Sequence, residues 1–357
     1  MKRIAAVMLI AVLLLTGCTA AEFPTAPTET APATAPPTQP LIPPTETTAP
    51  TEPETGFHIR MTFAGDCMLA TEMGYSGQGS FNQMVKEKEP AYFLAGAADV
   101  FLQDDFTVVN LENVLTDRAL AATEKDHDPA YWYRGPASNA DVLTAGGVEM
   151  VSLDNNHTQD YGYAGEKDTQ TAVENADVQW GNMNKTVYLE KNGYVIAVIC
   201  HGLWYGGQEN DIIRRIKSAS EKSDYQVVFF HGGKMNTHTP EDWKITGCRK
   251  MADAGADLIL GAHPHVLQRE EIYKGVPIVY SLGNFCYGGA ARPENRTILY
   301  TVDLKVDAGK LVEQTTEMIP YYVYTGSANN YQPVPIADET EKQKVLDFMH
   351  GNADSPL

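Results

Sequence analysis

Short apolar runs alternate along the chain with stretches that have helical spacing. The runs are rich in β-branched and aromatic residues and predict strands at residues 59–65, 107–109, 148–153, 187–189, 195–200, 226–230, 258–261 and 277–281. Helical spacing is found at residues 90–104, 138–145, 165–175, 211–222 and 241–254. Two late strands, 298–306 and 311–319, flank Asp307-Ala308-Gly309 and predict a hairpin. The order predicts an α/β fold with mixed sheets and helices on their faces.

Several predicted strands end at polar residues whose side chains can bind a metal ion. In open α/β sheets the ligand site lies outside the carboxyl ends of the strands. We therefore expect these side chains to converge at one edge of the sheet and to form a metal site. They are Asp66, Asn110, Glu112, Asn155, Asn156, His157, His231, His263 and His265.

The His263-Pro264-His265 element follows the strand at 258–261. In an extended backbone, residues i and i+2 point to the same side, and proline keeps the preceding residue out of the helical region. The pattern therefore predicts that both imidazoles face one metal ion. The alternative is a pair of surface histidines in a turn.

Asn156-His157 is the second informative element. The amide of Asn156 can ligate a metal, while His157 can donate a proton to a leaving group. Asp160 lies three residues on and is expected to orient the imidazole of His157. An ordinary Asx-type turn is the competing interpretation.

The other candidates are weaker when each is taken alone. Asp66 follows a strand end, and Asn110 and Glu112 lie on one side of an extended segment. The carboxylate of Glu112 would also suit a helix N-terminus. His231 ends a very apolar strand, so a hydrogen-bonded core histidine competes with a ligand there. The remaining histidines have no comparable context and are interpreted as structural or surface residues: His58, His127, His201, His238 and His350.

The beginning of the chain predicts export and a lipid anchor. Met1-Lys2-Arg3 precedes an apolar segment, residues 4–15, which is too short to span a bilayer but suits a signal peptide. Leu15-Thr16-Gly17-Cys18 resembles a bacterial lipobox, so we expect cleavage before Cys18, lipidation of Cys18, and a place on the extracytoplasmic face of the cell membrane. The alternative is a secreted protein that is cut near Ala20.

Composition divides the rest of the chain. Residues 19–56 are dominated by Pro, Thr, Ala and Glu and predict a disordered tether that reaches roughly 110 Å in polyproline geometry. Residues 57–330 suit one large domain, with two intimate lobes as the alternative, and residues 331–357 form a C-terminal helix and tail. The formal charge of −19 argues against nucleic acid as a partner. Buried free thiols are favoured over disulfides for Cys67, Cys200, Cys248 and Cys286.

The order of the motifs resembles the CapA-type capsule-synthesis family, which is similar to calcineurin-like metallophosphoesterases. The motifs are Gly65-Asp66, Asn110-Leu111-Glu112, Asn155-Asn156-His157 with Asp160-Tyr161-Gly162, His231, Gly261-Ala262-His263-Pro264-His265-Val266 and Ser281-Leu282-Gly283-Asn284-Phe285. The resemblance implies a four-layer α/β/β/α sandwich and a link to poly-γ-glutamate or a related cell-surface polymer. It implies metal ligation by Asp66, Glu112, Asn156, His231, His263 and His265, with His157 as proton donor. We assign substrate contacts to Asn110, Asn155, Lys234 and Asn284.

The chain departs from these family patterns at three places. Met68 stands where general metallophosphoesterases have a histidine ligand, and Asp154 stands where alanine is common. The usual His-Trp-Gly-x-Glu motif is His231-Gly232-Gly233-Lys234-Met235 here, so the carboxylate is missing and Lys234 adds a cation. These departures bear on substrate contacts more than on the metal.

Two main hypotheses follow from the sequence. The first is an exported hydrolase or transferase, in which one or two divalent ions activate water against an ester, phosphoester or amide. Mixed nitrogen and oxygen ligands favour Mn, Fe or Zn over Ca. The second is an accessory protein that binds or guides the polymer, or contacts its synthesis machinery, without turnover. A metal-capturing transport lipoprotein is a weaker third hypothesis, since the chain has no His-rich acidic loop.

Overall fold

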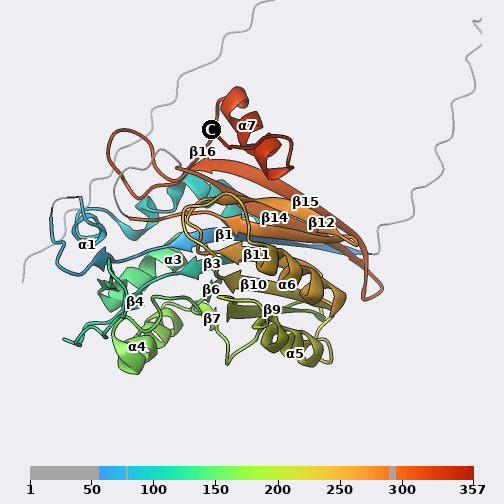
Figure 1. Cartoon of the computed structure of the whole chain (residues 1–357), viewed down its shortest axis with the longest axis horizontal. Helices are drawn as coiled ribbons and strands as arrows, with labels where there is room; N and C mark the ends of the chain where they lie inside the picture. The colour runs from blue at the N-terminus through green and yellow to red at the C-terminus, as the bar shows by residue number, and fades with distance from the viewer. Residues whose placement is uncertain (1–55, 78, 289–294) are drawn as a thin grey trace, which may run out of the picture. The chain divides into compact units, whose positions relative to one another are not determined.

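Two mixed β-sheets packed face to face lie at the centre of the computed structural model, which describes residues 56–77, 79–288 and 295–357 (Figure 1). The first sheet has the order β16 (Val334–Pro335), β15 (Lys310–Tyr322), β14 (Arg296–Asp307), β1 (Phe57–Cys67), β3 (Phe106–Leu111), β6 (Met150–Ser152) and β7 (Gln179–Gly181). The second has the order β12 (Leu267–Tyr273), β13 (Val276–Leu282), β11 (Leu258–Ala262), β10 (Tyr225–His231), β9 (Tyr194–Gly202) and β8 (Val187–Lys191). The predicted signal peptide, Cys18 and the tether lie outside the described residues.

Parallel strands form one side of the first sheet and the middle of the second. In the first sheet β1, β3, β6 and β7 run parallel, and β14, β15 and β16 add antiparallel strands beside β1. In the second sheet β9, β10, β11 and β13 run parallel, while β8 and β12 are antiparallel. The parallel strands therefore bring their carboxyl ends to a common edge, as the apolar runs predicted.

Alternating side chains explain why both faces of the central strands are buried. On β3, Val108 packs between the two sheets, whereas Val109 packs against the helices on the outer face. Phe63 from β1 meets Phe229 from β10 edge to face across the sandwich, with 6.1 Å between ring centroids. The interior between the sheets is thus an apolar core to which both sheets contribute.

Helices cover both outer faces of the sandwich. On the first sheet lie α1 (Phe81–Met84), α2 (Ala98–Phe101), α3 (Asp141–Ala145) and α4 (Gly162–Asn175). On the second lie α5 (Glu209–Ala219) and α6 (Asp242–Asp253). The helix α7 (Glu339–Met349) packs Val345 and Phe348 into the central core, so the C-terminal residues belong to the same packed unit. The predicted four-layer α/β/β/α sandwich is confirmed.

Two local predictions have different outcomes. The late hairpin is confirmed, because β14 and β15 pair around Ala308 and Gly309, which both have positive φ. The single helix predicted over residues 90–104 is wrong. That segment consists of the short 3₁₀ turns Pro90–Tyr92 and Ala95–Ala97 followed by α2. Gly96 packs so closely on the chain at residue 333 that a Cβ would lie 2.1 Å from the Pro333 carbonyl oxygen, and this tertiary contact overrides local helix propensity.

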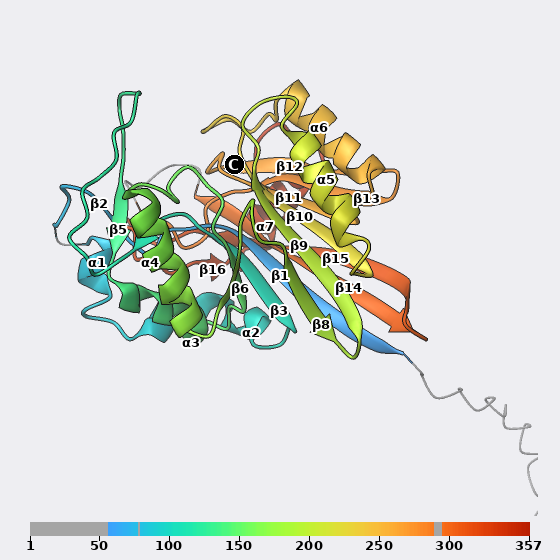
Figure 2. The ribbon, with the colours of Figure 1, turned by 90° about the horizontal axis from the view of Figure 1, so that it is seen from below.

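A third, small sheet lies beside the carboxyl edge. It has the order β2 (Thr71–Glu72), β5 (Tyr133–Gly135) and β4 (Val114–Leu115), with the 3₁₀ turn Ala137–Ala140 after it. The β4–β5 loop, residues 116–132, projects past α4 (Figure 2). The cysteines at 67, 200, 248 and 286 are buried free thiols, as predicted. Within the described ranges, every helix falls short of the length and hydropathy that crossing a bilayer requires.

Close backbone contact joins the two sheets at this edge. Asp66 N donates to Gly283 O, and Phe285 N donates to Asp66 O, so the end of β1 is tied to the segment after β13. A Cβ at Gly65 would lie 1.9 Å from the carbonyl oxygen of Gly283. Glycine is therefore required at position 65 for the two segments to approach, and this approach places Asp66 at the edge.

Candidate metal centre

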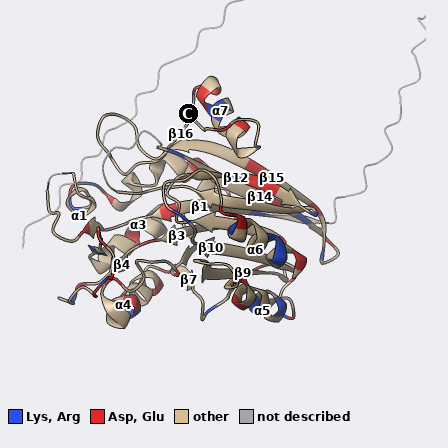
Figure 3. Cartoon of the chain, viewed as in Figure 1, with Lys and Arg blue, Asp and Glu red and all other residues tan. Residues whose placement is uncertain are grey.

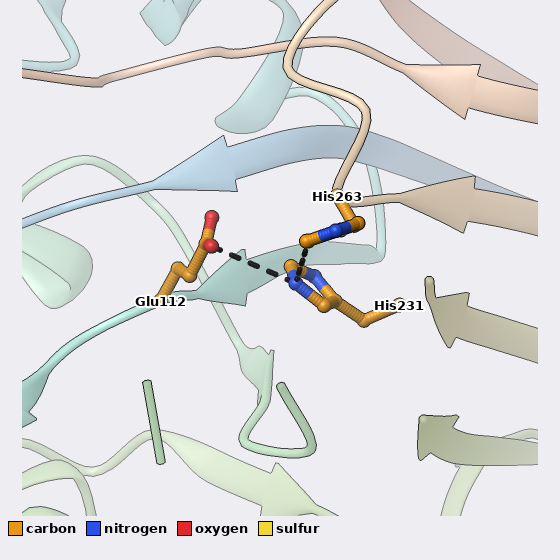
Figure 4. Close-up of side chains that lie close together, drawn as sticks. All are labelled: Glu112, His231 and His263. Atoms are coloured by element: carbon orange, nitrogen blue, oxygen red, sulfur yellow. Dashed lines mark hydrogen bonds and ion pairs between the residues drawn. The ribbon is translucent and has the colours of Figure 1, made fainter. Parts of the chain in front are cut away.

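Five predicted ligands from four separate segments converge at the carboxyl edge. Their ligand atoms form two buried groups, each with atoms within 4.8 Å of one another. The groups are Glu112 with His231 and His263, and Glu112 with Asp66 and His265. Figure 4 shows Glu112, after β3, facing His231 from the end of β10 and His263 from the loop after β11. Glu112 belongs to both groups, so its carboxylate would contribute to a metal held by either one.

Glu112 is a buried carboxylate without hydrogen-bond partners. Its side chain is fully buried, and neither oxygen has a hydrogen bond within the described part of the chain. Oε1 lies 3.6 Å from His231 Nε2 and 3.9 Å from the Nε2 atoms of His157 and His265. Burial, with the charges of Asp66 and Asp160, raises the pKa of Glu112 well above its ordinary value. An unpaired buried carboxylate facing imidazole nitrogens fits a cation.

Asp66 is also fully buried, but it is held in place by neighbours. Its Oδ1 accepts a hydrogen bond of 2.8 Å from Asn110 Nδ2, and its Oδ2 accepts one of 3.2 Å from the backbone N–H of His263. His265 Nδ1 lies 3.1 Å from Oδ2 and His231 Nδ1 lies 3.6 Å from Oδ1. The carboxylate is thus oriented toward the histidines.

The environment keeps the imidazoles of His231 and His263 neutral. Burial, followed by neighbouring histidines, lowers the pKa of His231 well below 6.5 and the pKa of His263 to about 3. His263 Nδ1 lies 3.0 Å from His231 Nε2, and Asn156 Oδ1 lies 2.7 Å from the same nitrogen. Neutral imidazoles offer lone pairs, which metal ligation requires. Asn156, a predicted ligand, therefore also lies at the cluster.

The two histidines of the His-Pro-His element converge by a different backbone than expected. The predicted extended geometry is wrong, because φ is 96° at His263 and 59° at His265. Positive φ is unfavourable for residues with a Cβ and is tolerated where surrounding contacts fix it. Each left-handed residue turns the chain, so the two imidazoles join different groups of the cluster, with ring centroids 5.7 Å apart.

His157 and Asp160 form the expected pair. His157 Nδ1 lies 2.9 Å from Asp160 Oδ2, and the other ring nitrogen, Nε2, faces Glu112. Burial lowers the pKa of His157, although the hydrogen bond with Asp160 opposes this shift. The ring is therefore neutral at pH 7, and a carboxylate fixes which nitrogen carries the proton.

The four predicted substrate contacts lie in two kinds of environment. Asn110 donates to Asp66 and lies 3.0 Å from His231 Nδ1, Asn155 donates to Leu111 O, and Asn284 Oδ1 lies 3.0 Å from His265 Nδ1. These amides already bond within the cluster and orient its members. Lys234 is exposed. Their roles toward a substrate stay predictions.

Four residues of the site were missed from the sequence. The aromatic ring of Trp204 lies 5.0 Å from the His263 ring, Tyr133 lies 4.7 Å from the His157 ring, and Tyr287 lies 4.9 Å from the His265 ring. Lys125 pairs with Asp160. All four lie on loops or short strands, where no periodicity marks them. Only Tyr287, which follows the predicted motif at residues 281–285, lies next to a motif along the chain.

The changed family motif has a structural counterpart. A Cβ at Gly232 would lie 1.7 Å from Leu203 O, so the family tryptophan does not fit this backbone. Instead Trp204, from the neighbouring β9–α5 loop, contacts the rings of both His231 and His263. Met235, at the position of the family glutamate, is exposed. Met68 is buried in an apolar cluster rather than facing the ligands.

The sandwich and the buried His/Asp/Glu cluster define an α/β/β/α protein with a candidate site for a divalent metal. The model of the bacterial capsule synthesis protein PGA_cap family matches residues 60–288, which is more than half of the 357 residues. The chain therefore belongs to this family. It is 27% identical to "PGA biosynthesis protein CapA" of Bacillus subtilis, over 80% of this chain and 78% of that protein.

Other comparisons extend this picture. The chain is 25% identical to "Capsule biosynthesis protein CapA" of Bacillus anthracis, over 84% of this chain and 75% of that protein. A "probable polyglutamine synthesis accessory protein" of Mycobacterium tuberculosis is 24% identical over 50% of this chain and 55% of its own length. Among solved structures, a hypothetical protein from Thermus thermophilus is similar with a TM-score of 0.44 and 16% identity, covering 73% of this chain and 98% of that one.

Proposed function

We propose that this protein is an exported, lipid-anchored member of the capsule or poly-γ-glutamate synthesis system, and that its metal centre promotes hydrolysis or transfer at an ester, phosphoester or amide bond. Family membership supports the connection with the polymer. The observation that carries the chemical part is the buried carboxylate of Glu112, which faces three imidazoles and has no hydrogen-bond partner in the described residues.

The residues that would hold the metal combine carboxylate, amide and imidazole donors. They are Asp66, Glu112, Asn156, His231, His263 and His265. When bound, a divalent cation polarises a substrate oxygen and makes water a nucleophile near neutral pH. This donor set favours Mn, Fe or Zn, and the shared Glu112 is compatible with one or two ions.

His157 would move the proton in this reaction. Its Nε2 points into the cluster while Nδ1 is held by Asp160, so Nε2 is the atom that accepts a proton and later gives it to a leaving group. Asp160 stabilises the imidazolium that forms in between. The neighbouring rings of Trp204, Tyr133 and Tyr287 surround the histidines and would limit the access of bulk water.

Metal analysis combined with a substrate panel tests this function. The purified protein would be loaded with Mn, Fe or Zn and offered phosphoesters, carboxylic esters and γ-glutamyl amides. We expect turnover of at least one class and its loss in the double variant His263→Ala/His265→Ala. The exposed His127 provides the control variant His127→Ala, which should keep wild-type turnover. Equal turnover in the double variant would exclude the catalytic proposal.

An accessory function is the second candidate. It is favoured by Met235, which is exposed where the family motif has a carboxylate, and by the name of the Mycobacterium tuberculosis relative. The net charge of −19 is unfavourable for a polyanion, and helices α5, α6 and α7 each carry both signs of charge (Figure 3). Metal-dependent binding of poly-γ-glutamate without turnover of the panel would support this function. Absence of binding with and without metal would exclude it.

The membrane anchor has its own test. Wild-type protein expressed in its bacterial host should incorporate labelled fatty acid and sediment with membranes. The variant Cys18→Ala should lose the label and appear in the soluble exported fraction. Membrane association of both forms to the same extent would contradict lipidation at Cys18.

A further inference from the structure

The buried carboxylate of Asp160 contacts three groups that come from two different segments. Its Oδ2 lies 2.9 Å from His157 Nδ1 and accepts a hydrogen bond of 2.7 Å from the backbone N–H of Tyr133. Its Oδ1 lies 2.6 Å from Lys125 Nζ, an ion pair rather than an aligned hydrogen bond. Asp160 is therefore held on one side by the residue that it orients and on the other by the β4–β5 loop and the strand that follows it.

We propose that Lys125 is a positioning residue, which acts through Asp160 to hold the His157 ring in one tautomer with Nε2 facing Glu112. The role of His157 as proton donor rests on the proposed function. The effect of Lys125 on the His157 tautomer does not. Asp160 is fully buried, and a nearby cation compensates for the cost of burying its carboxylate. The Lys125 side chain is itself largely buried, with 13% of its surface exposed, so its charge acts at short range through little water.

The loop that carries Lys125 is fixed to the turn that carries His157. Thr123 N donates to Asp160 O at 2.9 Å, and Thr123 Oγ1 lies 3.2 Å from Gln159 O. Trp132 Nε1 donates to Thr123 O at 2.8 Å, and Lys125 Nζ lies over the Trp132 ring at 5.6 Å. Lys125 Nζ also donates to Tyr131 O at 2.6 Å. These contacts place the ammonium group beside Asp160 in a single arrangement.

Residues of the segment 116–133 therefore act on the His157 ring in two ways, by direct packing and through Asp160. Tyr133 packs its ring nearly perpendicular to the His157 ring, at an interplanar angle of 79°. Lys125 fixes the carboxylate that accepts the Nδ1 proton. With the proton on Nδ1, the lone pair is on Nε2, which is the nitrogen that faces Glu112 at 3.9 Å.

The tautomer of His157 tests the proposal without reference to turnover. Histidine-selective ¹⁵N labelling of the full chain, metal-free, gives long-range ¹H–¹⁵N spectra, and His157→Gln identifies the His157 signals by their loss. We expect wild type to show one tautomer, with the proton on Nδ1. In Lys125→Met the ¹⁵N shifts of Nδ1 and Nε2 should move toward each other, as both tautomers become populated. Lys125→Arg should restore the wild-type spectrum.

Lys191→Met is the matched control. Lys191 Nζ also lies 2.6 Å from a carboxylate oxygen, that of Asp105, and it donates to His58 O, so this lysine joins β8 to β1. Its replacement should leave the His157 signals unchanged. Unchanged His157 signals in Lys125→Met, or equal changes in Lys191→Met, would overturn the proposal. If Lys125→Met does not fold, Lys125→Gln, which removes the charge but keeps a hydrogen-bond donor, is judged by the same two outcomes.

A turnover assay separates this proposal from the proposed function. If the loaded protein hydrolyses a substrate of the panel, Lys125→Met should lower kcat about tenfold or more with KM unchanged, and Lys125→Arg should recover it. If no substrate is turned over but the tautomer shifts as expected, the catalytic function fails while the positioning role of Lys125 stands. A normal kcat in Lys125→Met would contradict the role.

Discussion

Two fully buried carboxylates lie at the same edge of the sandwich, and their surroundings are opposite. Asp160 contacts an ammonium group, a backbone N–H and an imidazole. Glu112 has no hydrogen bond within the described residues, and its carboxylate faces imidazole nitrogens and lies near the carboxylate of Asp66. Burial of a carboxylate is costly in both places, but the protein supplies compensation in one only.

The difference indicates two uses of a buried carboxylate. Asp160 is a permanent part of the structure whose task is to hold a neighbouring ring. Glu112 has no such compensation among the described residues, and the proposed cation would supply it, so its stability would depend on the ligand. Burial of apolar side chains in the core between the sheets offsets the unfavourable free energy of burying these carboxylates.

The largest effect is expected from breaking the compensated pair. Lys125→Met leaves the Asp160 carboxylate buried without its cation and should lower the free energy of unfolding by about 3 kcal/mol. Adding Asp160→Asn should recover part of this loss, because the uncompensated charge is then gone. Urea denaturation of the two single variants and the double variant measures the coupling. Additive losses would show that the pair is not coupled.

A smaller effect is expected from filling the uncompensated site. Mn, Fe or Zn at about one hundred times its dissociation constant should stabilise the wild-type protein by about 2.7 kcal/mol, and a chelator should reverse this. Thermal unfolding followed by calorimetry measures the shift. The stabilisation should disappear in His263→Ala/His265→Ala and persist in His127→Ala. A shift of equal size in the double variant would mean that the metal binds elsewhere.

In the metal-free protein, Glu112→Gln and Asp160→Asn should change the free energy of unfolding in opposite directions. Removing a buried and uncompensated charge should raise the stability of the metal-free protein by about 1 kcal/mol, whereas Asp160→Asn should lower it. Parallel denaturation curves in the presence of a chelator provide the measurement. If Glu112→Gln destabilises the metal-free protein as much as Asp160→Asn does, the carboxylate of Glu112 has a structural task.

The smallest effect is expected at a third carboxylate, that of Asp104, which is partly buried and is not part of the candidate site. One oxygen accepts from Thr107 Oγ1 and the other has no hydrogen bond in the described chain. Burial raises the pKa of Asp104 to about 7 from 3.8. The folded state then binds more protons than the unfolded state between these values, so this group lowers stability as pH rises from about 4 to about 7. The stability of Asp104→Asn minus that of wild type should therefore be larger at pH 8 than at pH 5. Thermal unfolding of both proteins at the two pH values measures this difference.

The sequence predicted what depends on periodicity. Apolar runs such as residues 226–230 and 258–261 identified β10 and β11, and the polar residues after them identified side chains that gather at the strand ends. The sandwich could be expected because both faces of such strands must be covered. The broken segment at 90–101 could not, since it depends on a contact of Gly96 with residue 333, far away in the sequence.

The parts of the site that escaped prediction depend on loops. The convergence of His263 and His265 was expected, but from an extended backbone, whereas positive φ angles imposed by the surrounding structure bring it about. Lys125 and Tyr133 precede Asp160 by more than twenty residues, and only the path of the β4–β5 loop brings them to it. Side-chain pairing across such loops leaves no local pattern in the sequence.

Metal content tests the central claim most directly. The purified wild-type protein and Glu112→Gln would be dialysed against equal low concentrations of Mn, Fe and Zn salts under exclusion of air, and bound metal per chain would be measured by inductively coupled plasma mass spectrometry. The account predicts one or two equivalents of at least one divalent metal in wild type and a clear loss in Glu112→Gln. Metal-free wild type, or equal metal in both proteins, would contradict it.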